Sequence, residues 1–564
     1  MHSSTTPSTP LQQLFEDEWE FRLRENPLFA TYVGDHRYND RLPHVTEDDF
    51  ARRLAQMRTF RRRLEAIDRS TLTSEEQLNY DIFRRSLEDE TGELEFRAYL
   101  MPIAKAGGFH TEFADLPVMA PFYNLGDYEN YLARLEAFPS YVAEYIDLMR
   151  AGIRSGYVPA RDVMEGVDDS LRAQLVDVPE KSIFFQPFER FPQTISTANQ
   201  QRLRQAGMAA IQNAILLGHR QLLQFIHEEY LFAARQEIAA SALPDGPAFY
   251  DHRIRYFTSL RLTPQEVHAT GLAEVQRIHA EMQALIDKVA FQGSFQDFIG
   301  FLRTDPRFYV DTPEALLKEV AFVLKKMDGE LPRLFKTLPR MPYGIRPIPE
   351  FSAPGNTTAY YFPPSGDGSR AGIYYVNTYD LKSRPLYEIE ALSLHEAVPG
   401  HHLQIALQQE LEGLPNFRRF GGFVAFVEGW ALYAERLGLE VGFYQDPFSD
   451  FGRLTYEMWR ACRLVVDTGM HALGWSRQQA IDFMTENTAS TLLNIVNEVD
   501  RYIAWPGQAL AYKIGELKIR ELRAQAEQAL GQEFNLRQFH SLILSGGALP
   551  LDILEGRVYS WLKS

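Results

Sequence analysis

Three histidines and a glutamate stand close together in the run HEAVPGHH, which spans residues 395–402. Imidazole nitrogens and carboxylate oxygens are the ligands that a catalytic Zn²⁺ takes, with a water molecule completing its coordination. In the common helical arrangement, H-E-x-x-H, two histidines four residues apart share one helix face, and the glutamate beside the first acts as base. The run therefore indicates a site for one zinc ion, with Glu396 as the general base of a hydrolysis.

The spacing within this run is longer than the common one. His401 follows His395 by six positions and His402 by seven, and six positions of unbroken helix rise about 9 Å, which is too far for one ion. Pro399 disrupts the helical hydrogen bond to the fourth residue back, and Gly400 accepts dihedral angles that other residues avoid. We expect the helix to break there, so that His395 and His401 share the ion, with His402 as the alternative second ligand.

A third ligand is expected from a neighbouring helix. Glu428 lies 27 positions after His401, which is enough chain for one helix to end and another to pack back against it. It stands in an otherwise apolar run, where an unpaired carboxylate is costly. Gly429 beside it permits close approach of another backbone. Glu428 is therefore the predicted third ligand.

Polar residues further along could line the site. Arg463, Asp467 and His471 are four positions apart and share one helix face. This stripe is either a structural ion-pair ladder or a wall of the site, in which Asp467 orients His471 toward the substrate and its oxyanion. The remaining candidates for substrate binding are an arginine, a lysine and three tyrosines, namely Arg501, Lys513, Tyr502, Tyr360 and Tyr374. Arg463 is a further candidate.

Helical patterns dominate the elements that must position these residues. Capping-box sequences begin at Thr73, Thr263 and Ser476, and long amphipathic runs cover about 198–236, 263–289 and 312–336. The segment 338–385 differs because it is rich in proline and glycine and contains two short β-prone runs, 359–362 and 372–376, joined by a Gly-rich loop. The sequence therefore predicts a mainly α protein with a small antiparallel hairpin directly before the metal motif.

Four segments are expected along the chain. Residues 1–10 are polar and predicted to be a disordered tail; 11–337 are mostly helical; 338–385 hold the hairpin; and 386–564 form the helical catalytic region. We expect these segments to make one compact unit with two lobes.

Composition excludes several classes of function. The formal net charge of −17 argues against nucleic acid, which requires a basic footprint, and gives no attraction to anionic membranes. Cys462 is the single cysteine, so neither an intramolecular disulfide nor a thiolate zinc site is expected. The N-terminus lacks the pattern of a secretory signal. A cytoplasmic location is the simplest expectation, and a periplasmic or exported one follows if a leader has been removed.

Four motifs carry a resemblance to a known family. They are HEAVPGHHLQ at 395–404, VEGWALYAE at 427–435, RYIAWPGQALAYK at 501–513 and GSRAGIYYVN at 368–377. With them the chain resembles the bacterial family catalogued as domain of unknown function 885, which is similar to helical zinc peptidases of the gluzincin type, such as thermostable carboxypeptidase, thimet oligopeptidase and angiotensin-converting enzyme.

This resemblance implies a two-lobed helical body with a deep central cleft whose walls include 11–337, zinc at its floor and a β edge beside it. It implies a metallopeptidase that cleaves short peptides, as a carboxypeptidase or an oligopeptidase. It also implies a tyrosine that donates to the oxyanion, for which Tyr512 is the candidate beside His471. Position 432 is leucine, where those peptidases carry an acidic residue, so Glu435 is expected to support a ligand instead.

Alternative functions use the same residues. Two histidines and one carboxylate also suit a non-haem iron enzyme, and a helical binding protein with a vestigial metal site is the non-catalytic alternative. The oligomeric state is open between monomer and homodimer. His110 could reach the site, and the sequence does not decide whether it does.

Overall fold

The computed structural model describes residues 9–105, 107–350 and 353–563, and the chain divides into two compact units. The first unit comprises Met1–Glu237 with two short later segments, Ser365–Asp367 and Pro415–Phe417. The second comprises Ile238–Pro364, Gly368–Leu414 and Arg418–Ser564. Residues 238–337 therefore group with the metal motif rather than with the helices that precede them in the chain.

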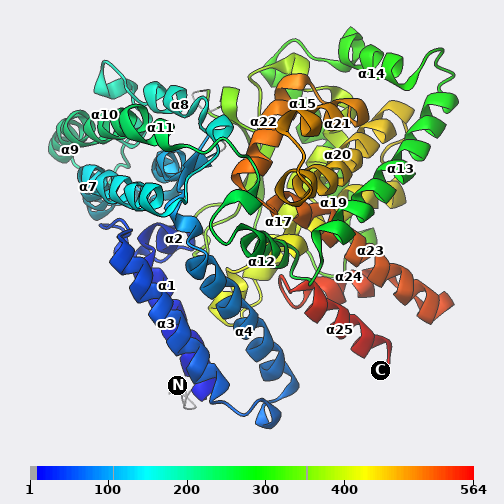
Figure 1. Ribbon diagram of the computed structural model, residues 1–564, viewed down its shortest axis with the longest axis horizontal. Helices are drawn as coiled ribbons and strands as arrows, with labels where there is room; N and C mark the ends of the chain where they lie inside the picture. Colours follow the sequence, from blue (N-terminus) through cyan, green and yellow to red (C-terminus); the bar gives the residue numbers. More distant parts are fainter. Residues whose placement is uncertain (1–8, 106, 351–352, 564) are drawn as a thin grey trace. The chain divides into compact units, whose positions relative to one another are not determined.

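The first unit is almost entirely helical (Figure 1). Its helices are α1 (Pro10–Glu25), α2 (Pro27–Tyr32), α3 (Glu47–Glu65), α4 (Ser74–Glu95), α5 (Phe109–Glu112), α6 (Leu116–Met119), α7 (Leu125–Ser155), α8 (Val167–Ala173), α9 (Thr197–Ala210), α10 (Leu216–Phe225) and α11 (Leu231–Ala233). Two π turns join α9, α10 and α11 into one continuous helix, which corresponds to the amphipathic run predicted at 198–236. Strands β1 (Ile103–Ala104) and β2 (Gly107–Gly108) form a short antiparallel pair.

The second unit is also mainly helical. Its helices are α12 (Gly246–Thr258), α13 (Pro264–Lys288), α14 (Phe295–Thr304), α15 (Pro313–Leu334), α16 (Ile389–Glu396), α17 (His401–Gln409), α19 (Val424–Leu437), α20 (Pro447–Ala472), α21 (Arg477–Asn487), α22 (Leu492–Ala504), α23 (Ala511–Leu530), α24 (Leu536–Leu544) and α25 (Leu551–Leu562). The short α18 (Asn416–Arg419) lies where the chain passes between the units. The prediction of a mainly α protein is confirmed.

The predicted helix starts are present. Thr73, Thr263 and Ser476 each accept a hydrogen bond from the backbone three residues on, and the side chain at that position bonds back to the cap. These reciprocal bonds satisfy amide groups that have no partner within the helix. The predicted tail at 1–10 falls mostly on 1–8, outside the described residues, while Thr9 caps α1 and Pro10 begins it.

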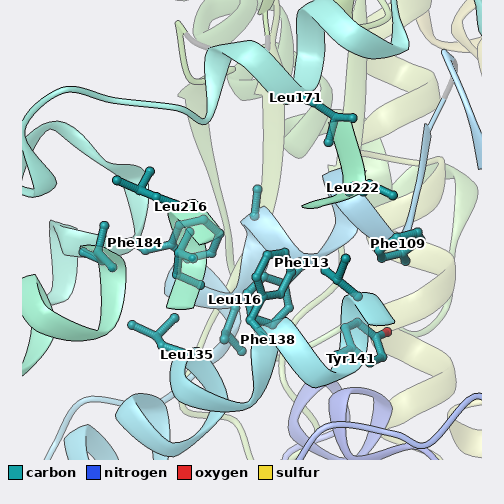
Figure 2. Packing of buried hydrophobic residues seen from close by; sticks show 14 of the residues in the cluster. Phe109, Phe113, Leu116, Leu135, Phe138, Tyr141, Leu171, Phe184, Leu216 and Leu222 are labelled. Atoms are coloured by element: carbon teal, nitrogen blue, oxygen red, sulfur yellow. The ribbon is translucent and has the colours of Figure 1, made fainter. Parts of the chain in front are cut away.

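Aromatic side chains fill the core of the first unit, as Figure 2 shows. Phe113 and Phe138 stack with ring centroids 4.5 Å apart, and both are almost fully buried. A methyl group at Gly218 of α10 would lie 2.7 Å from the Phe138 ring, so glycine lets α10 approach α7 closely. Because rings bury large apolar areas, this cluster stabilises the first unit by itself.

Close helix pairs build the second unit. Helices α19 and α23 meet at Gly429 and Gly515, where a methyl group on Gly429 would lie 2.4 Å from the Gly515 carbonyl carbon. Helix α13 packs along α20, and a methyl group at Gly271 would meet the Val465 side chain at 2.7 Å. These contacts fix α19, α20 and α23, which carry several of the predicted site residues, including Glu428 and Glu435.

The sheet of the second unit has three strands, β3 (Tyr343–Pro347), β4 (Ala359–Phe362) and β5 (Gly372–Val376), in the order β3-β5-β4. Strands β4 and β5 form the predicted antiparallel pair, with Tyr361 opposite Tyr374. Strand β3, which was not predicted because its segment is rich in proline and glycine, pairs in parallel with β5. The small sheet is therefore mixed, and β5 is its central strand.

Within the described part of the chain, no helix combines the length and the hydropathy that crossing a membrane requires.

Candidate metal centre

The helix that carries the HEAVPGHH run breaks at the predicted place. Helix α16 ends at Glu396 and α17 begins at His401, and the Trp430 indole donates to the Pro399 carbonyl at 2.9 Å. A methyl group at Gly400 would lie 1.9 Å from the His395 carbonyl oxygen, so the close turn requires glycine. The break brings the two histidine side chains to the same place.

His395, His401 and Glu428 form a group that could hold a metal ion. Their ligand atoms all lie within 4.8 Å of one another, with Glu428 Oε2 at 3.7 Å from His395 Nε2 and 3.4 Å from His401 Nε2. An ion about 2 Å from each ligand in a tetrahedral site separates the ligands by about 3.3 Å. The two distances from Glu428 to the histidine nitrogens lie close to this value.

The environment of these atoms also fits a cation. Glu428 Oε2 is buried and has no hydrogen-bond partner among the described residues, and a buried charge without partner or metal is costly. Burial raises the pKa of Glu428, but the imidazoles of His401 and His395 lower it, so the pKa lies well below its usual range. The carboxylate is therefore ionised and ready to bind a cation.

Glu435 forms a hydrogen bond with the Nδ1 atom of His395, the first histidine of the run. His395 Nδ1 lies 2.8 Å from Glu435 Oε1, and both side chains are buried. Donation from Nδ1–H leaves Nε2 as the ligand atom, which is the arrangement that metal-binding histidines commonly use. The Arg460 guanidinium lies 3.6 Å from the same carboxylate oxygen. Sequence reasoning missed Arg460, because only the packing of α20 against α19 brings it to Glu435.

His402 points to a different set of partners. Its Nδ1 accepts from the Tyr361 hydroxyl at 2.8 Å, and its Nε2 donates to the Met341 carbonyl at 3.0 Å. Both nitrogens are therefore engaged by the β-sheet segment, and the metal group contains His401 instead. Tyr361 is a second residue that the sequence analysis did not single out; its position on a strand facing the motif was the available signal.

Glu396 lies at the C-terminal end of α16, next to His395 in the chain, and is buried. Burial raises its pKa, the two imidazoles lower it and Glu428 raises it, with a net shift upward. Tyr374 on the central strand is completely buried, and Glu396 contributes to the rise of its pKa after burial. Tyr374 is thus buried within electrostatic reach of Glu396, and its predicted contact with substrate stays a prediction.

Tyr512 lies at the start of α23. Its hydroxyl accepts from the Gln508 amide at 3.3 Å, and the Arg463 guanidinium lies 4.4 Å from the centre of its ring. Burial raises its pKa, and Glu428 raises it further. The half-buried Tyr512 therefore stands within electrostatic reach of a predicted metal ligand.

His471 and Asp467 are engaged elsewhere. The Ala240 amide donates to His471 Nδ1 at 2.9 Å, and Nε2 donates to the Tyr502 carbonyl at 3.0 Å. Asp467 accepts from the Tyr250 hydroxyl at 2.6 Å and from the Gly507 amide. The predictions that Asp467 orients His471 and that His471 serves substrate are wrong, because both side chains hold backbone and core groups in place.

The other residues predicted to bind substrate lie in different environments. Lys513 is fully buried and pairs with Glu274, Glu457 and Glu516 at 2.8–2.9 Å, so its prediction as a substrate anchor is wrong. Tyr502 is buried and accepts from Arg463 at 2.8 Å.

Arg463 also pairs with Glu498 at 3.1 Å and is buried, so neither it nor Tyr502 is open to substrate. Arg501 donates to Glu498 and to the Gln508 side chain at 2.8 Å and keeps 17% of its side chain exposed. Arg501 therefore remains a possible anchor. Tyr360, half-buried on β4, stacks on Tyr375 at 4.9 Å.

His110 belongs to α5 of the first unit. It is 3% exposed, and burial lowers its pKa to about 3. Its imidazole is therefore neutral, and its predicted role at the metal centre stays a prediction.

Fold and site together define a mainly helical protein with a buried group of two histidines and one glutamate that could hold a metal. The chain belongs to the family described as bacterial protein of unknown function (DUF885), which matches residues 27–558. No curated protein was found to match it.

Two solved structures are similar over their whole length. One, a candidate lipoprotein from Colwellia psychrerythraea, is 29% identical with a TM-score of 0.93, covering 98% of each chain. The other, a candidate lipoprotein of unknown function from Shewanella oneidensis, is 19% identical with a TM-score of 0.71, covering 97% of this chain and 99% of that one. The second likeness concerns the fold alone.

Proposed function

We propose that this protein is a zinc-dependent hydrolase, and specifically a metallopeptidase that cleaves short peptides. The observation that carries the proposal is the convergence of His395, His401 and Glu428 beside the buried Glu396, with Glu435 behind His395. A non-catalytic structural zinc site closes all four positions with protein ligands, whereas three ligands leave one for water. The acidic residue beside the first histidine favours hydrolysis over oxygen chemistry.

The residues of the candidate metal centre have distinct roles in the proposed hydrolysis. His395, His401 and Glu428 would hold a Zn²⁺, which would supply a water of lowered pKa and a Lewis acid for the scissile carbonyl. Glu396 would take the proton from that water and pass it to the leaving amine, and its position next to His395 in the chain suits this transfer. Glu435 holds the tautomer of His395.

Tyr512 is the proposed donor to the oxyanion. His471 is no longer a candidate, since both of its nitrogens already bind backbone groups. Arg463 over the Tyr512 ring and the Gln508 amide at its hydroxyl hold the phenol in place. Removal of one such donor typically costs about 10²–10³ in rate.

Substrate binding is proposed at the sheet. Because β5 is central, β3 and β4 are the edges that could pair with an extended peptide through main-chain hydrogen bonds. Arg501 is the proposed anchor for a substrate carboxylate, a role that agrees with cleavage near a peptide C-terminus. Carboxypeptidase and oligopeptidase action release different products, so analysis of the products distinguishes them.

The test combines metal analysis with product analysis. Protein purified without added metal should carry about one equivalent of zinc, and a mixed peptide library incubated with it should yield shortened products by mass spectrometry. Glu396→Gln should keep zinc and fold and lose turnover, while Glu412→Gln, at an exposed position shortly after α17, should match the wild type. Predominant iron together with oxygen consumption would contradict this proposal and support a non-haem iron enzyme. Stoichiometric metal without any turnover would contradict it and support a non-catalytic binding protein.

We further propose a location in the cell envelope in place of the cytoplasm. The support is the 29% identical relative from Colwellia psychrerythraea, which is described as a candidate lipoprotein. Fractionation of the native host with an antibody against this chain tests the location.

A further inference from the structure

A hollow lies between α19 and α23, and none of the candidate metal ligands lines it. Its volume is about 570 Å³, within the range of small-molecule sites. Apolar side chains form much of its wall, including Leu437, Leu439, Leu517 and Ala524. Arginines complete it, notably Arg436 and Arg520. The hollow thus combines an apolar wall with cationic groups.

The acidic residues of this wall already have cationic partners. Glu440 and Glu527 both pair with Arg523. Glu521 pairs with Lys518 at 2.8 Å. The carboxylates that line the hollow are therefore paired with cations other than Arg436.

Arg436 makes only a long ion pair. Its Nη1 is shielded from solvent and has no hydrogen-bond partner among the described residues. The nearest carboxylate oxygen that it approaches belongs to Glu457, at 3.8 Å, and Glu457 already pairs with Lys513 and Arg453. A guanidinium has five N–H donors, and leaving a buried one unpaired is costly.

Further positive charge surrounds this guanidinium. Arg520 lies on the facing helix α23 and lines the same hollow. Burial, Arg520 and Arg453 lower the pKa of Arg436 more than Glu457 and Glu516 raise it. An anion placed in the hollow would pair with Arg436 and offset this repulsion. Arginine also binds carboxylates through two parallel hydrogen bonds.

We propose that the hollow between α19 and α23 binds a small carboxylate with an apolar body, its carboxylate on Arg436 and its apolar part against the leucines. This ligand class follows from the two kinds of wall, because a compact inorganic anion leaves the apolar surface uncovered and a hydrocarbon leaves the guanidinium unpaired. None of the candidate metal ligands lines this site, so the test of carboxylate binding is independent of the proposed peptidase function.

The experiment compares octanoate with 1-octanol, which share an alkyl chain and differ in charge. Calorimetric titration of the full-length protein should give at least tenfold tighter binding of octanoate. In Arg436→Gln the octanoate affinity should fall at least tenfold, toward that of octanol. The matched variant Arg333→Gln, whose arginine is exposed on α15 of the same unit, should bind octanoate as the wild type does.

Ala524→Phe provides a second variant that leaves every charge in place. Ala524 is exposed on α23 at the wall of the hollow, so a phenyl ring there should fill space and reduce octanoate affinity at least tenfold without unfolding the chain. Circular dichroism verifies the fold of each variant. Equal binding of octanoate and octanol by the wild type, or undiminished octanoate binding by Ala524→Phe or by folded Arg436→Gln, overturns the proposal.

Discussion

His395 and Glu435 form a hydrogen bond of 2.8 Å between buried side chains of two different helices, α16 and α19. The same helix α19 also supplies Glu428, so one helix provides both a metal ligand and the support for another. Glu435 thus lies seven positions after Glu428, about two helical turns further along the same helix. Its hydrogen bond to His395 also gives the first prediction.

Glu435→Gln should weaken zinc binding about 10–100-fold, because a neutral amide is a poorer partner for the His395 Nδ1–H than a carboxylate. Competition with a calibrated zinc chelator measures the affinity. Glu533→Gln, an exposed glutamate outside the site, serves as control. Unchanged affinity in Glu435→Gln would remove Glu435 from the site.

The two adjacent histidines should behave differently. His401→Ala should lose stoichiometric zinc, since it removes one of three ligands. His402→Ala should keep zinc, because its ring binds Tyr361 and Met341. Elemental analysis after dialysis distinguishes them, and loss of zinc from His402→Ala alone would reverse the assignment.

Gly400→Ala should destabilise the protein by about 1–3 kcal/mol or more, as overpacking does, because the new methyl group would lie 1.9 Å from the His395 carbonyl oxygen. Zinc content should fall with it, since the turn between α16 and α17 must move. Gly413→Ala is the matched control, because no atom lies within 4 Å of its added methyl group. Denaturant unfolding gives both values, and equal stabilities would contradict the close turn.

The raised pKa of Asp467 predicts that the stability of the protein depends on pH. Burial raises its pKa to about 7, against opposing hydrogen bonds from Tyr250 and the Gly507 amide, whereas an unfolded aspartate has a pKa of about 3.9. The folded state therefore binds the proton more tightly, and its stability falls as pH rises from about 4 to about 7. The slope from this group reaches at most about 1.4 kcal/mol per pH unit.

Asp467→Asn should reduce that slope, because an amide does not titrate. Urea unfolding at pH 5 and pH 8 measures the free energy of unfolding of both proteins. Should the wild type and Asp467→Asn show the same difference between the two pH values, the buried carboxyl would not be the source.

The local sequence was sufficient to predict those elements whose stabilising contacts lie within a few residues. Pro399 and Gly400 predict the break between α16 and α17, because the proline lacks an amide hydrogen and the glycine lacks a side chain in the turn itself. Capping at Thr73 and Thr263 was predictable for the same reason, since both partners lie within three residues. Strand β3 was not, because its pairing with β5 depends on residues about 30 positions away.

The sequence by itself determined the helical class, the break between α16 and α17 and the group of residues that could hold a metal ion. Only the tertiary structure separated His401 from His402, since that choice depends on Tyr361 and Met341, which lie on other segments. It alone removed Lys513 from the set of substrate anchors, because the carboxylates that neutralise it come from α13 and α20 as well as from its own helix. Periodicity and spacing report which face of a helix a side chain occupies, whereas the partner of a charged or polar group is fixed only when distant helices pack together.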